Sequence, residues 1–406
     1  MAAEPAPPAG ATQDDRDLAQ YRERLDRPIG LKADELQHND RLRHVIFSGQ
    51  FTTDSLAELC ASADRIRLLS RSRSGKDFLR GLLAHNRAML YFTQPSTRTF
   101  LSFMAACQVL GITCNEVRDP QTSSETKGET RFDSIRMFSS YFDLIIMRSP
   151  IARLAESCAY LMNDLAELGQ RNVPIINAGS GADEHPTQAL LDIYTLMRTF
   201  QFEGARKPLA DGADGQIKPG LAGKTYAFCG DIGRGRTVRS LAMLLANYPE
   251  VRLVFVAPEH ATLRMGDDLR DRLTATGTPF EEVDSFESVI ESPLGSGPVI
   301  EQIDALYMTR VQKEHDTADI AASYAGIDFT RYCLSPTLVG RMREHAPILH
   351  PFPRNQHFGE IPTEIDRDPR AMYFRQARNG MWARAALLAS MLRVDREIAG
   401  YYADRA

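Results

Sequence analysis

The sequence has no apolar run near the roughly 20 residues that a membrane-spanning helix needs. It also lacks a net positive charge: its formal charge is −5, which argues against nucleic acid or an anionic membrane as the main partner. The first stretch, MAAEPAPPAGATQDDRD, has neither the basic start nor the apolar core of a secretory signal. We therefore expect a cytoplasmic globular protein with a disordered or variable extension over residues 1–40.

Clustered cysteines are also lacking. The six cysteines are scattered, and none belongs to a CxxC pair or a Cys/His group with zinc spacing. Six thiols could form bridges, but their mostly apolar contexts favour buried free cysteines. No Ser-His-Asp motif, P-loop or metal cluster is recognisable.

Short β-rich runs alternate with helical patterns over most of the chain, which is typical of α/β proteins with parallel sheets and crossover helices. We expect buried strands at 88–92, 143–148, 173–179, 225–230, 252–258 and 304–309. We expect a domain boundary near Ala182 to His185, after the segment INAGSG (176–181). We expect the last helix to begin near Gly380 and to pack back on the first domain.

Residues 96–99, Ser-Thr-Arg-Thr, stand where the first strand gives way to an apolar helical pattern. Backbone N–H groups at a helix start lack intrahelical partners and carry the positive end of the dipole, so anions bind there. Ser96, Thr97 and Thr99 add hydroxyl donors. Arg98 adds a planar guanidinium that fits phosphate. An anion site fits this segment, and so does an ordinary helix cap with a solvent-facing arginine.

Two later segments repeat this strand-to-helix layout. HPTQALL offers His185 and Gln188 to a polar ligand from one helical turn, although a plain helix entry with proline has the same pattern. The turn from Gly230 resembles a dinucleotide-binding turn, with Glu259 at roughly the spacing of a ribose contact. Its glycine order is GxxGxG rather than GxGxxG, and Arg236 in the turn suits a carboxylate at least as well.

Further polar and cationic residues lie at strand ends or in loops: Lys127, Arg148, Arg310 and Gln312. Another strand ends in the rigid segment Pro351-Phe352-Pro353, whose carbonyls cannot all find strand partners. Because an acidic chain collects cations at these positions, we expect it to bind a small, multiply anionic substrate.

Taken together, these motifs resemble the catalytic chains of the aspartate carbamoyltransferase family. The matching segments occur in family order: STRTFLSF (96–103), KGET (127–130), MR (147–148), HPTQ (185–188), GRTVRSL (235–241), TRVQKE (309–314) and HPFPR (350–354). The resemblance implies two doubly wound parallel-sheet domains. Residues 41–184, completed by a C-terminal helix at 379–406, would bind carbamoyl phosphate, and residues 185–378 would bind L-aspartate.

The resemblance also assigns roles around carbamoyl phosphate. Its phosphate would be held by Ser96, Thr97, Arg98 and Thr99. Its carbonyl oxygen would be stabilised, as negative charge develops, by Thr99, Arg148 and His185. Its NH2 group would be oriented by Gln188 and by the backbone carbonyls around Pro351 and Phe352.

For the second substrate, Arg236 would pair with the α-carboxylate of aspartate, and Arg310, helped by Gln312, with the β-carboxylate. Ser123 and Lys127 would reach into a neighbouring subunit's site, so a homotrimer would share its active sites. The implied reaction is direct attack of the aspartate amine on the carbamoyl carbon, an early step of de novo pyrimidine biosynthesis. It needs no metal or cofactor, because juxtaposing two bound anions and stabilising the tetrahedral oxyanion does most of the work.

Some positions depart from the family pattern. Gln94 and His315 stand where the family usually has Glu and Arg, a pair that can bridge the domains in the closed state. Phe100 and Met104 replace an ion pair at i, i+4 spacing. Phe352 replaces Leu, and residues 355–359 look like a short insertion. These changes concern closure and turnover more than substrate identity.

Three alternatives remain. An ornithine carbamoyltransferase is disfavoured because Arg310 would oppose a cationic side chain. A catalytically silent homologue, acting as a scaffold or regulatory subunit, would have no need of the retained binding residues. A nucleotide-binding dehydrogenase has only the Gly230 turn in its favour.

Overall fold

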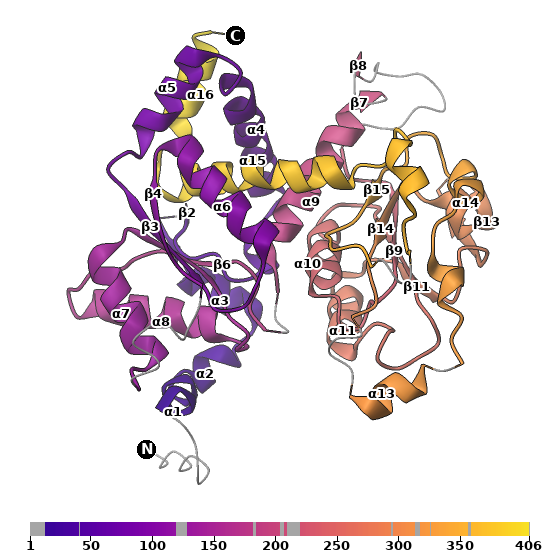
Figure 1. Cartoon of the computed structure of the whole chain (residues 1–406), viewed down its shortest axis with the longest axis horizontal. Helices are drawn as coiled ribbons and strands as arrows, with labels where there is room; N and C mark the ends of the chain where they lie inside the picture. Colours follow the sequence, from indigo (N-terminus) through magenta and orange to yellow (C-terminus); the bar gives the residue numbers. More distant parts are fainter. Residues whose placement is uncertain are drawn as a thin grey trace. The chain divides into compact units, whose positions relative to one another are not determined.

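The computed structural model describes residues 13–39, 41–118, 128–181, 184–203, 207–208, 220–293, 295–312, 317–324, 326–355 and 359–405. The chain divides into two compact units (Figure 1): Met1–Thr187 with Gly380–Ala406, and Gln188–Asn379. Each unit contains a parallel sheet with helices on both faces, so the predicted α/β class is confirmed. Among the described helices, none has the length and apolar character needed to cross a membrane.

The sheet of the first unit has the strand order β4-β3-β5-β6, with all strands parallel. Its strands are β3 (Arg87–Phe92), β4 (Thr113–Val117), β5 (Leu144–Arg148) and β6 (Ile175–Asn177). β5 is buried along its whole length, which explains the apolar run of its first four residues, Leu-Ile-Ile-Met. The strand order reverses between β3 and β5, and such a switch point is where open α/β sheets bind ligands.

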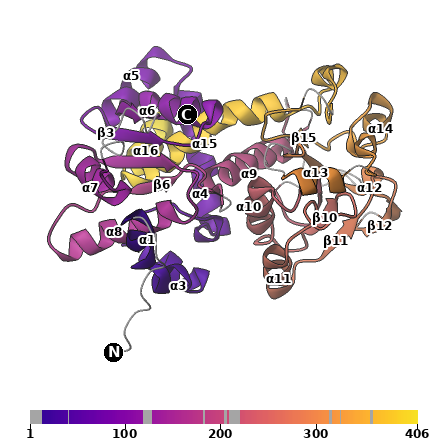
Figure 2. The same ribbon diagram turned by 60° about the horizontal axis from the view of Figure 1, so that its bottom comes forward.

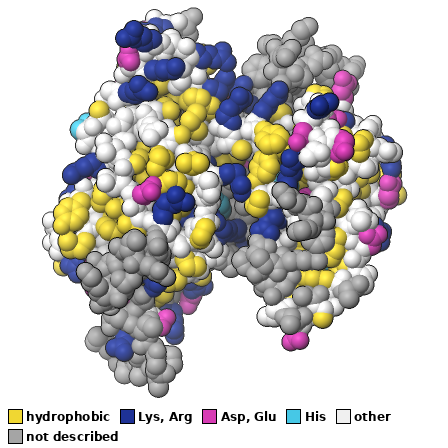
Figure 3. Space-filling view, viewed as in Figure 1, with side chains coloured by type: hydrophobic (Ala, Val, Ile, Leu, Met, Phe, Trp, Pro, Cys, Tyr) yellow, Lys and Arg dark blue, Asp and Glu magenta, His cyan; other side chains and the backbone are white. Residues whose placement is uncertain are grey.

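Two helical layers cover this sheet (Figures 1 and 2). One layer contains α4 (Thr53–Leu69), α5 (Arg73–Leu82), α6 (Thr97–Leu110) and α16 (Asp395–Ala403). The other contains α7 (Arg131–Tyr141) and α8 (Leu154–Glu167). Figure 3 shows Lys and Arg side chains gathered over α5 and α16, with patches of hydrophobic side chains elsewhere on the visible face of the unit.

Within the disordered or variable extension expected over residues 1–40, residues 13–39 contain regular secondary structure. Residues 13–39 form α1 (Gln13–Ala19), α2 (Arg22–Leu25) and α3 (Ile29–Glu35), followed by a short hairpin of β1 (Gln37–His38) and β2 (Arg41–Leu42). Leu25 and Leu36 are buried in the core of the unit. Lys32 Nζ lies 2.8 Å from Glu156 Oε1 on α8, and both side chains are largely buried. These helices are too short to show a periodic pattern, and only tertiary packing stabilises them.

Val45 extends the sheet by a single-residue bridge at its β6 edge. Its N–H donates to the Ile175 carbonyl at 2.9 Å, and its carbonyl accepts from the Asn177 N–H at 2.8 Å. The neighbouring His44 is fully buried, with Nδ1 accepting from the Ile175 N–H at 3.0 Å. The chain thus passes from the N-terminal helices along the edge of the sheet.

The sheet of the second unit has the order β11-β10-β9-β14-β15, again parallel throughout. Its strands are β9 (Thr225–Cys229), β10 (Arg252–Val256), β11 (Phe280–Val283), β14 (Ala305–Met308) and β15 (Ile348–Leu349). Phe228 on β9 stacks on Phe255 and contacts Tyr307, so aromatic rings fill one face of the sheet. The order reverses between β9 and β14, which makes this the switch point of the second unit.

The remaining elements of the second unit surround this sheet (Figure 1). Its helices are α9 (Pro186–Gln201), α10 (Arg236–Leu245), α11 (Asp267–Thr276), α12 (Val299–Gln302), α13 (Ala318–Ser323) and α14 (Pro336–Gly340). Two hairpins pair β7 (Phe202–Glu203) with β8 (Lys207–Pro208), and β12 (Val289–Ser292) with β13 (Gly295–Pro298).

The last helical region differs from the prediction at both ends. α15 spans Tyr373–Met391, so it begins seven residues before Gly380. It continues through Asn379, a poor helix former, because the Asn379 Nδ2 donates to Thr195 Oγ1 in the interior at 3.0 Å. α16 is a separate helix, since Arg393 adopts a positive φ of 65° between the two.

The prediction of buried free cysteines is confirmed for four of the six, whereas Cys114 and Cys333 are free but half-buried. All six thiols are free, and four of them are buried: Cys60, Cys107, Cys158 and Cys229. Burial raises the pKa of the Cys60 and Cys229 thiols well above the ordinary value, so these side chains behave as neutral core residues.

Candidate active site

The end of β3 leads directly into the start of α6. Ser96 occupies the N-cap with extended backbone (φ −162°, ψ 93°), and its hydroxyl makes no capping hydrogen bond. Thr97 and Arg98, the first two residues of the helix, are exposed. The structure therefore presents two hydroxyls and a guanidinium around the N–H groups that begin α6, which suits an anion.

Three of the predicted residues come together in the first unit from separate segments. Thr99 is in the first turn of α6, Arg148 ends β5, and His185 lies in the turn before α9. The Oγ1 of Thr99 and the Nε2 of His185 are 3.5 Å apart, and Arg148 Nη1 donates to the Ala178 carbonyl at 3.0 Å. All three are less than 10% exposed. A buried guanidinium beside an imidazole and a hydroxyl is suited to a developing negative charge.

Gly179 makes this packing possible, and the sequence analysis did not single it out. A Cβ at this position would lie 2.6 Å from Arg148 Nη1 and 3.1 Å from His185 Cδ2, and its φ is +101°. Asn177 Oδ1 accepts its N–H at 2.8 Å. The Ala-Gly-Ser-Gly turn directly after a strand was the signal that could have identified it.

The structure describes some of the positions in the first unit that depart from the family pattern. The N–H of Gln94 donates to the Arg148 carbonyl at 3.2 Å, so its backbone supports the Arg148 strand end. Phe100 is buried edge-on against Phe92, and the Arg118 guanidinium lies 4.6 Å from its ring centroid. Ser123, Lys127 and His315 lie outside the described residues, as do 356–358 of the suspected insertion.

In the second unit, the predicted arginines follow the two strands at the switch point. Arg236 is the first residue of α10, and Arg310 comes just after β14. Both side chains are half-buried. Guanidinium groups at these strand ends are suited to carboxylates, which they can bind with two parallel hydrogen bonds.

Asp231, a second residue that the sequence analysis missed, joins these two strand ends. Its N–H donates to Thr309 Oγ1 at 3.0 Å, and its carboxylate accepts the Gln312 N–H at 3.0 Å. The same carboxylate pairs with Arg234 at 2.6 Å and is fully buried. The cation at Arg234 is therefore compensated within the turn. The sequence signal that could have identified Asp231 is an acidic residue directly after Gly230, at the end of β9.

The glycine-rich turn does not fit a dinucleotide. The N–H groups of Ile232 and Gly233 both donate to the Leu263 carbonyl at 3.0 Å. A Cβ on Gly230 would lie 2.2 Å from the Thr309 carbonyl oxygen. The turn thus packs against the protein's own backbone, where a pyrophosphate would need its N–H groups.

Gln188 belongs to a buried network around Asp192, one helical turn later on α9. Asp192 Oδ1 accepts from Gln188 Nε2 at 3.0 Å and from Gln376 Nε2 at 2.6 Å. Asp192 Oδ2 accepts from the Tyr307 hydroxyl at 2.9 Å. Burial and the Asp192 carboxylate raise the pKa of Tyr307 well above its usual value, so the phenol stays protonated. Sequence analysis missed Asp192, although its i, i+4 spacing from Gln188 was visible.

Hydrogen bonds fix the backbone of the segment 350–354 at His350 and at Phe352. The His350 N–H donates to Gln376 Oε1 at 2.8 Å, and the Phe352 N–H donates to His350 Nδ1 at 2.8 Å. Phe352 has a positive φ of 59°, unusual for a bulky residue, and a cis bond to Pro353. Its ring contacts the rings of Tyr373 and Phe374, which also contact each other. These contacts fix the direction of the Pro351 and Phe352 carbonyls.

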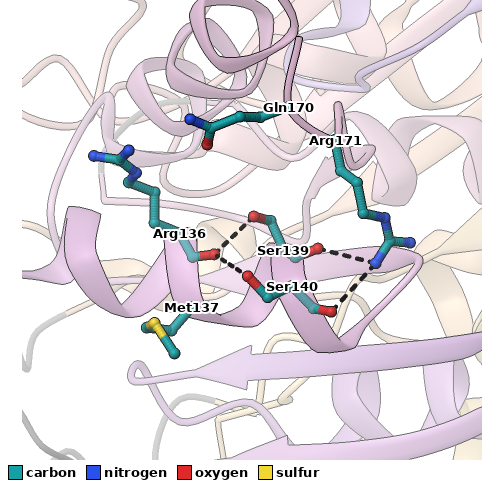
Figure 4. A pocket seen from close by; sticks show the side chains of 6 residues that line it. All are labelled: Arg136, Met137, Ser139, Ser140, Gln170 and Arg171. Atoms are coloured by element: carbon teal, nitrogen blue, oxygen red, sulfur yellow. Dashed lines mark hydrogen bonds between the residues drawn. The ribbon is translucent and has the colours of Figure 1, made fainter. Parts of the chain in front are cut away.

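A separate surface cavity of about 310 Å³ lies at the end of α7 (Figure 4). Its lining residues are Arg136, Met137, Ser139, Ser140, Gln170 and Arg171. Arg171 donates to the Ser139 and Ser140 carbonyls and pairs with Asp143 at 2.6 Å. Its charge is thus compensated, and the cavity includes none of the predicted site residues.

Comparison with protein families gives two adjacent matches. Residues 43–198 match the "Aspartate/ornithine carbamoyltransferase, carbamoyl-P binding domain". Residues 222–391 match the "Aspartate/ornithine carbamoyltransferase, Asp/Orn binding domain". Helices α1 to α3 precede the first match.

Individual relatives agree with this result. The chain is 37% identical to the chloroplastic aspartate carbamoyltransferase of Arabidopsis thaliana over 86% of this chain and 78% of that protein. It is 36% identical to the aspartate carbamoyltransferase catalytic subunit of Vibrio campbellii over 86% of this chain and 96% of that protein.

A solved structure of Trypanosoma cruzi aspartate transcarbamoylase in complex with carbamoyl phosphate and aspartate is also similar. It has a TM-score of 0.69 and 31% identity, over 86% of this chain and 96% of that chain.

Proposed function

Because this chain belongs to the aspartate/ornithine carbamoyltransferase family, we propose that it transfers the carbamoyl group of carbamoyl phosphate to the amine of L-aspartate. The products are N-carbamoyl-L-aspartate and phosphate. One observation carries the proposal: in each unit, cations or anion-binding groups follow both strands that flank the switch point. These are the α6 start and Arg148 in the first unit, and Arg236 and Arg310 in the second.

The first unit binds carbamoyl phosphate. The phosphate lies at the start of α6, where Ser96, Thr97, Arg98 and Thr99 supply donors. The carbonyl oxygen is held by Thr99, Arg148 and His185. Because these three side chains are buried and already close together, they stabilise the oxyanion without costly reorganisation when the amine attacks.

The second unit binds L-aspartate. Arg236 pairs with the α-carboxylate, and Arg310 with Gln312 pairs with the β-carboxylate. A cationic ornithine side chain would meet Arg310 instead of an anion, and like charges would oppose its binding. This charge argument favours aspartate within a family whose description covers both amino acids.

The carbamoyl NH2 group requires acceptors, which Gln188 and the carbonyls of Pro351 and Phe352 provide. The amine attacks the carbamoyl carbon, a tetrahedral intermediate forms, and the C–O bond to phosphate breaks. Orientation of the two bound reactants and stabilisation of the oxyanion supply the acceleration. The departing phosphate can accept the amine proton.

The active form is a homotrimer in the cytoplasm, and its reaction is an early step of de novo pyrimidine biosynthesis. Ser123 and Lys127 from one subunit enter the site of its neighbour. An isolated subunit therefore has little activity.

The test is carbamoyl transfer by purified protein with carbamoyl phosphate and either L-aspartate or L-ornithine. We expect product with aspartate only, and a fall in kcat/KM on the order of 10³ for Arg310→Ala, because the β-carboxylate loses its partner. Arg341→Ala is the control, since Arg341 pairs with Glu287 and Glu301 on the surface of the same unit. Product with ornithine would refute the substrate assignment. No product with either amine would favour a silent homologue.

A further inference from the structure

Asp192 is the buried carboxylate at the centre of a network that the proposed reaction does not use directly. It is fully buried in α9 and accepts hydrogen bonds from Gln188, Gln376 and Tyr307. Its three donors come from α9, α15 and β14, two of them more than 100 residues away in sequence. A buried carboxylate with three donors is stabilised in its ionised form.

An ionised carboxylate can only accept hydrogen bonds, and this fixes the orientation of both amides. Gln188 and Gln376 must each turn their NH2 group toward Asp192. The carbonyl oxygen of each amide then points elsewhere. For Gln376, that oxygen accepts the N–H of His350 at 2.8 Å. The Asp192 carboxylate therefore fixes the orientation of the Gln376 side-chain amide, which could otherwise rotate by about 180° and exchange its NH2 group and its oxygen.

The effect of Asp192 extends to the segment 350–354 through successive hydrogen bonds. Asp192 orients Gln376, Gln376 holds the N–H of His350, and His350 Nδ1 accepts the N–H of Phe352. This order of donors and acceptors sets the direction of the backbone at Phe352, where φ is +59°. One carboxylate thus governs a side-chain acceptor at Gln188 and the backbone acceptors at Pro351 and Phe352.

We infer that Asp192 is a positioning residue that makes this group of atoms selective for the NH2 of carbamoyl phosphate. It turns the Gln188 oxygen and the Pro351 and Phe352 carbonyls into a set of acceptors, which an NH2 donor satisfies and a methyl group does not. The inference rests on the proposed function, because it concerns recognition of the carbamoyl group. Its specificity follows from the cost of leaving buried acceptors without donors.

Acetyl phosphate is the probe that isolates this recognition, since it replaces the NH2 of carbamoyl phosphate with a methyl group of similar size. The measured quantity is the ratio of the acetyl phosphate inhibition constant to the carbamoyl phosphate dissociation constant. General damage to the protein weakens both ligands alike and leaves this ratio unchanged.

Two variants test the inference, one by removing every acceptor at position 192 and one by removing only part of them. Asp192→Leu removes every acceptor at the position, and we expect the ratio to fall about tenfold, the value of one charge-assisted hydrogen bond. Asp192→Asn keeps one acceptor oxygen, and we expect a fall of about threefold with normal folding. In both variants the KM for L-aspartate should change by less than twofold.

Thr195→Val is the matched control. Thr195 and Asn379 connect the same two helices one turn farther along, through a buried hydrogen bond of 3.0 Å that involves neither carboxylate nor site amide. This variant should lose stability but keep the ratio.

The outcomes separate this inference from the proposed function. An unchanged ratio in Asp192→Asn, or an equal fall in Thr195→Val, would overturn the role of Asp192 while wild-type transfer stands. Failure of the wild-type protein to bind carbamoyl phosphate would instead overturn the proposed function, and the role of Asp192 with it.

Discussion

The two units place a glycine of positive φ at the end of a strand, and they use it differently. Gly179 follows β6 with φ +101°, and the space beside it holds the side chains of Arg148 and His185. Gly230 follows β9 with φ +116°, and the space beside it holds the backbone of Thr309. The first unit thus builds its site by packing side chains. The second unit builds its site by locking two strand ends together.

This difference matches the exposure of the cations. Arg148 is buried in the first unit, where its proposed role is to stabilise a charge that appears only during the reaction. Arg236 and Arg310 are half-buried, and their proposed partners are carboxylates that arrive already charged. Equivalent substitutions in the two units should therefore affect different properties.

The largest effect is expected for Gly230→Ala. Its Cβ would lie 2.2 Å from the Thr309 carbonyl oxygen, so the strand ends must separate and the hydrogen bonds of Asp231 must break. We expect the free energy of unfolding to fall by about 3 kcal/mol or more, as measured by urea denaturation. Gly277→Ala is the control, since Gly277 has φ +67° but open space around it, and should cost about 1 kcal/mol. Equal losses would contradict this account.

A smaller effect on stability, and a specific one on turnover, is expected for Gly179→Ala. The Arg148 guanidinium would have to move away from a Cβ only 2.6 Å distant, and such a displacement costs about 100-fold in kcat. Steady-state kinetics with both substrates measures this loss. Gly169→Ala, with φ +73° and no nearby atoms, should leave kcat unchanged. A stable Gly179→Ala protein with normal kcat would remove the functional distinction between the two glycines.

The smallest expected effect is a difference in acid sensitivity. Burial, and secondarily Arg43, lower the pKa of His44 to about 3 in the first unit. The unfolded chain therefore binds more protons than the folded chain below about pH 6.5, and stability falls as the pH falls. Between pH 7 and pH 5 this should cost about 2 kcal/mol, which His44→Gln should abolish in urea denaturation at the two pH values.

The second unit provides the contrast for this experiment. Burial raises the pKa of Asp366, but hydrogen bonds from Arg354 and Tyr373 outweigh it, and the pKa lies below the ordinary value. Its contribution is present above the unfolded carboxyl pKa, about 3.9, and is lost only as the pH falls further. Asp366→Asn should therefore leave the change in stability between pH 7 and pH 5 unaltered. An equal change in wild-type and His44→Gln proteins would show that His44 is not responsible.

The sequence was sufficient to predict strands that are buried on both faces. β5 and β9 have continuous apolar sequences, and both were predicted. β4 and β11 were missed because edge strands are partly exposed, and Thr-Cys-Asn-Glu-Val and Phe-Glu-Glu-Val alternate too weakly. The helices over 13–39 were missed because they depend on contacts such as Lys32 with Glu156, 124 positions apart in the printed sequence.

Candidate site residues could be proposed from the sequence where they lie at a strand end: Arg148 is the last residue of β5, and Arg310 lies two positions after β14. Asp192 could not be recognised in this way, since its function depends on Tyr307 and Gln376, 115 and 184 residues away. Asp231 likewise acts through the Thr309 hydroxyl and the Gln312 N–H, which lie just after β14. Sequence patterns identify the groups that face a ligand more readily than those that hold them in place.

The Val45 bridge also has a consequence for aggregation. A parallel edge strand such as β6 presents unpaired N–H and carbonyl groups that can pair with the edge of another molecule. Val45 occupies the carbonyl of Ile175 and the N–H of Asn177. Proteolysis that removed the chain through residue 46 would therefore do more than weaken the first unit. It would expose a hydrophobic β-edge and make the remaining chain prone to self-association.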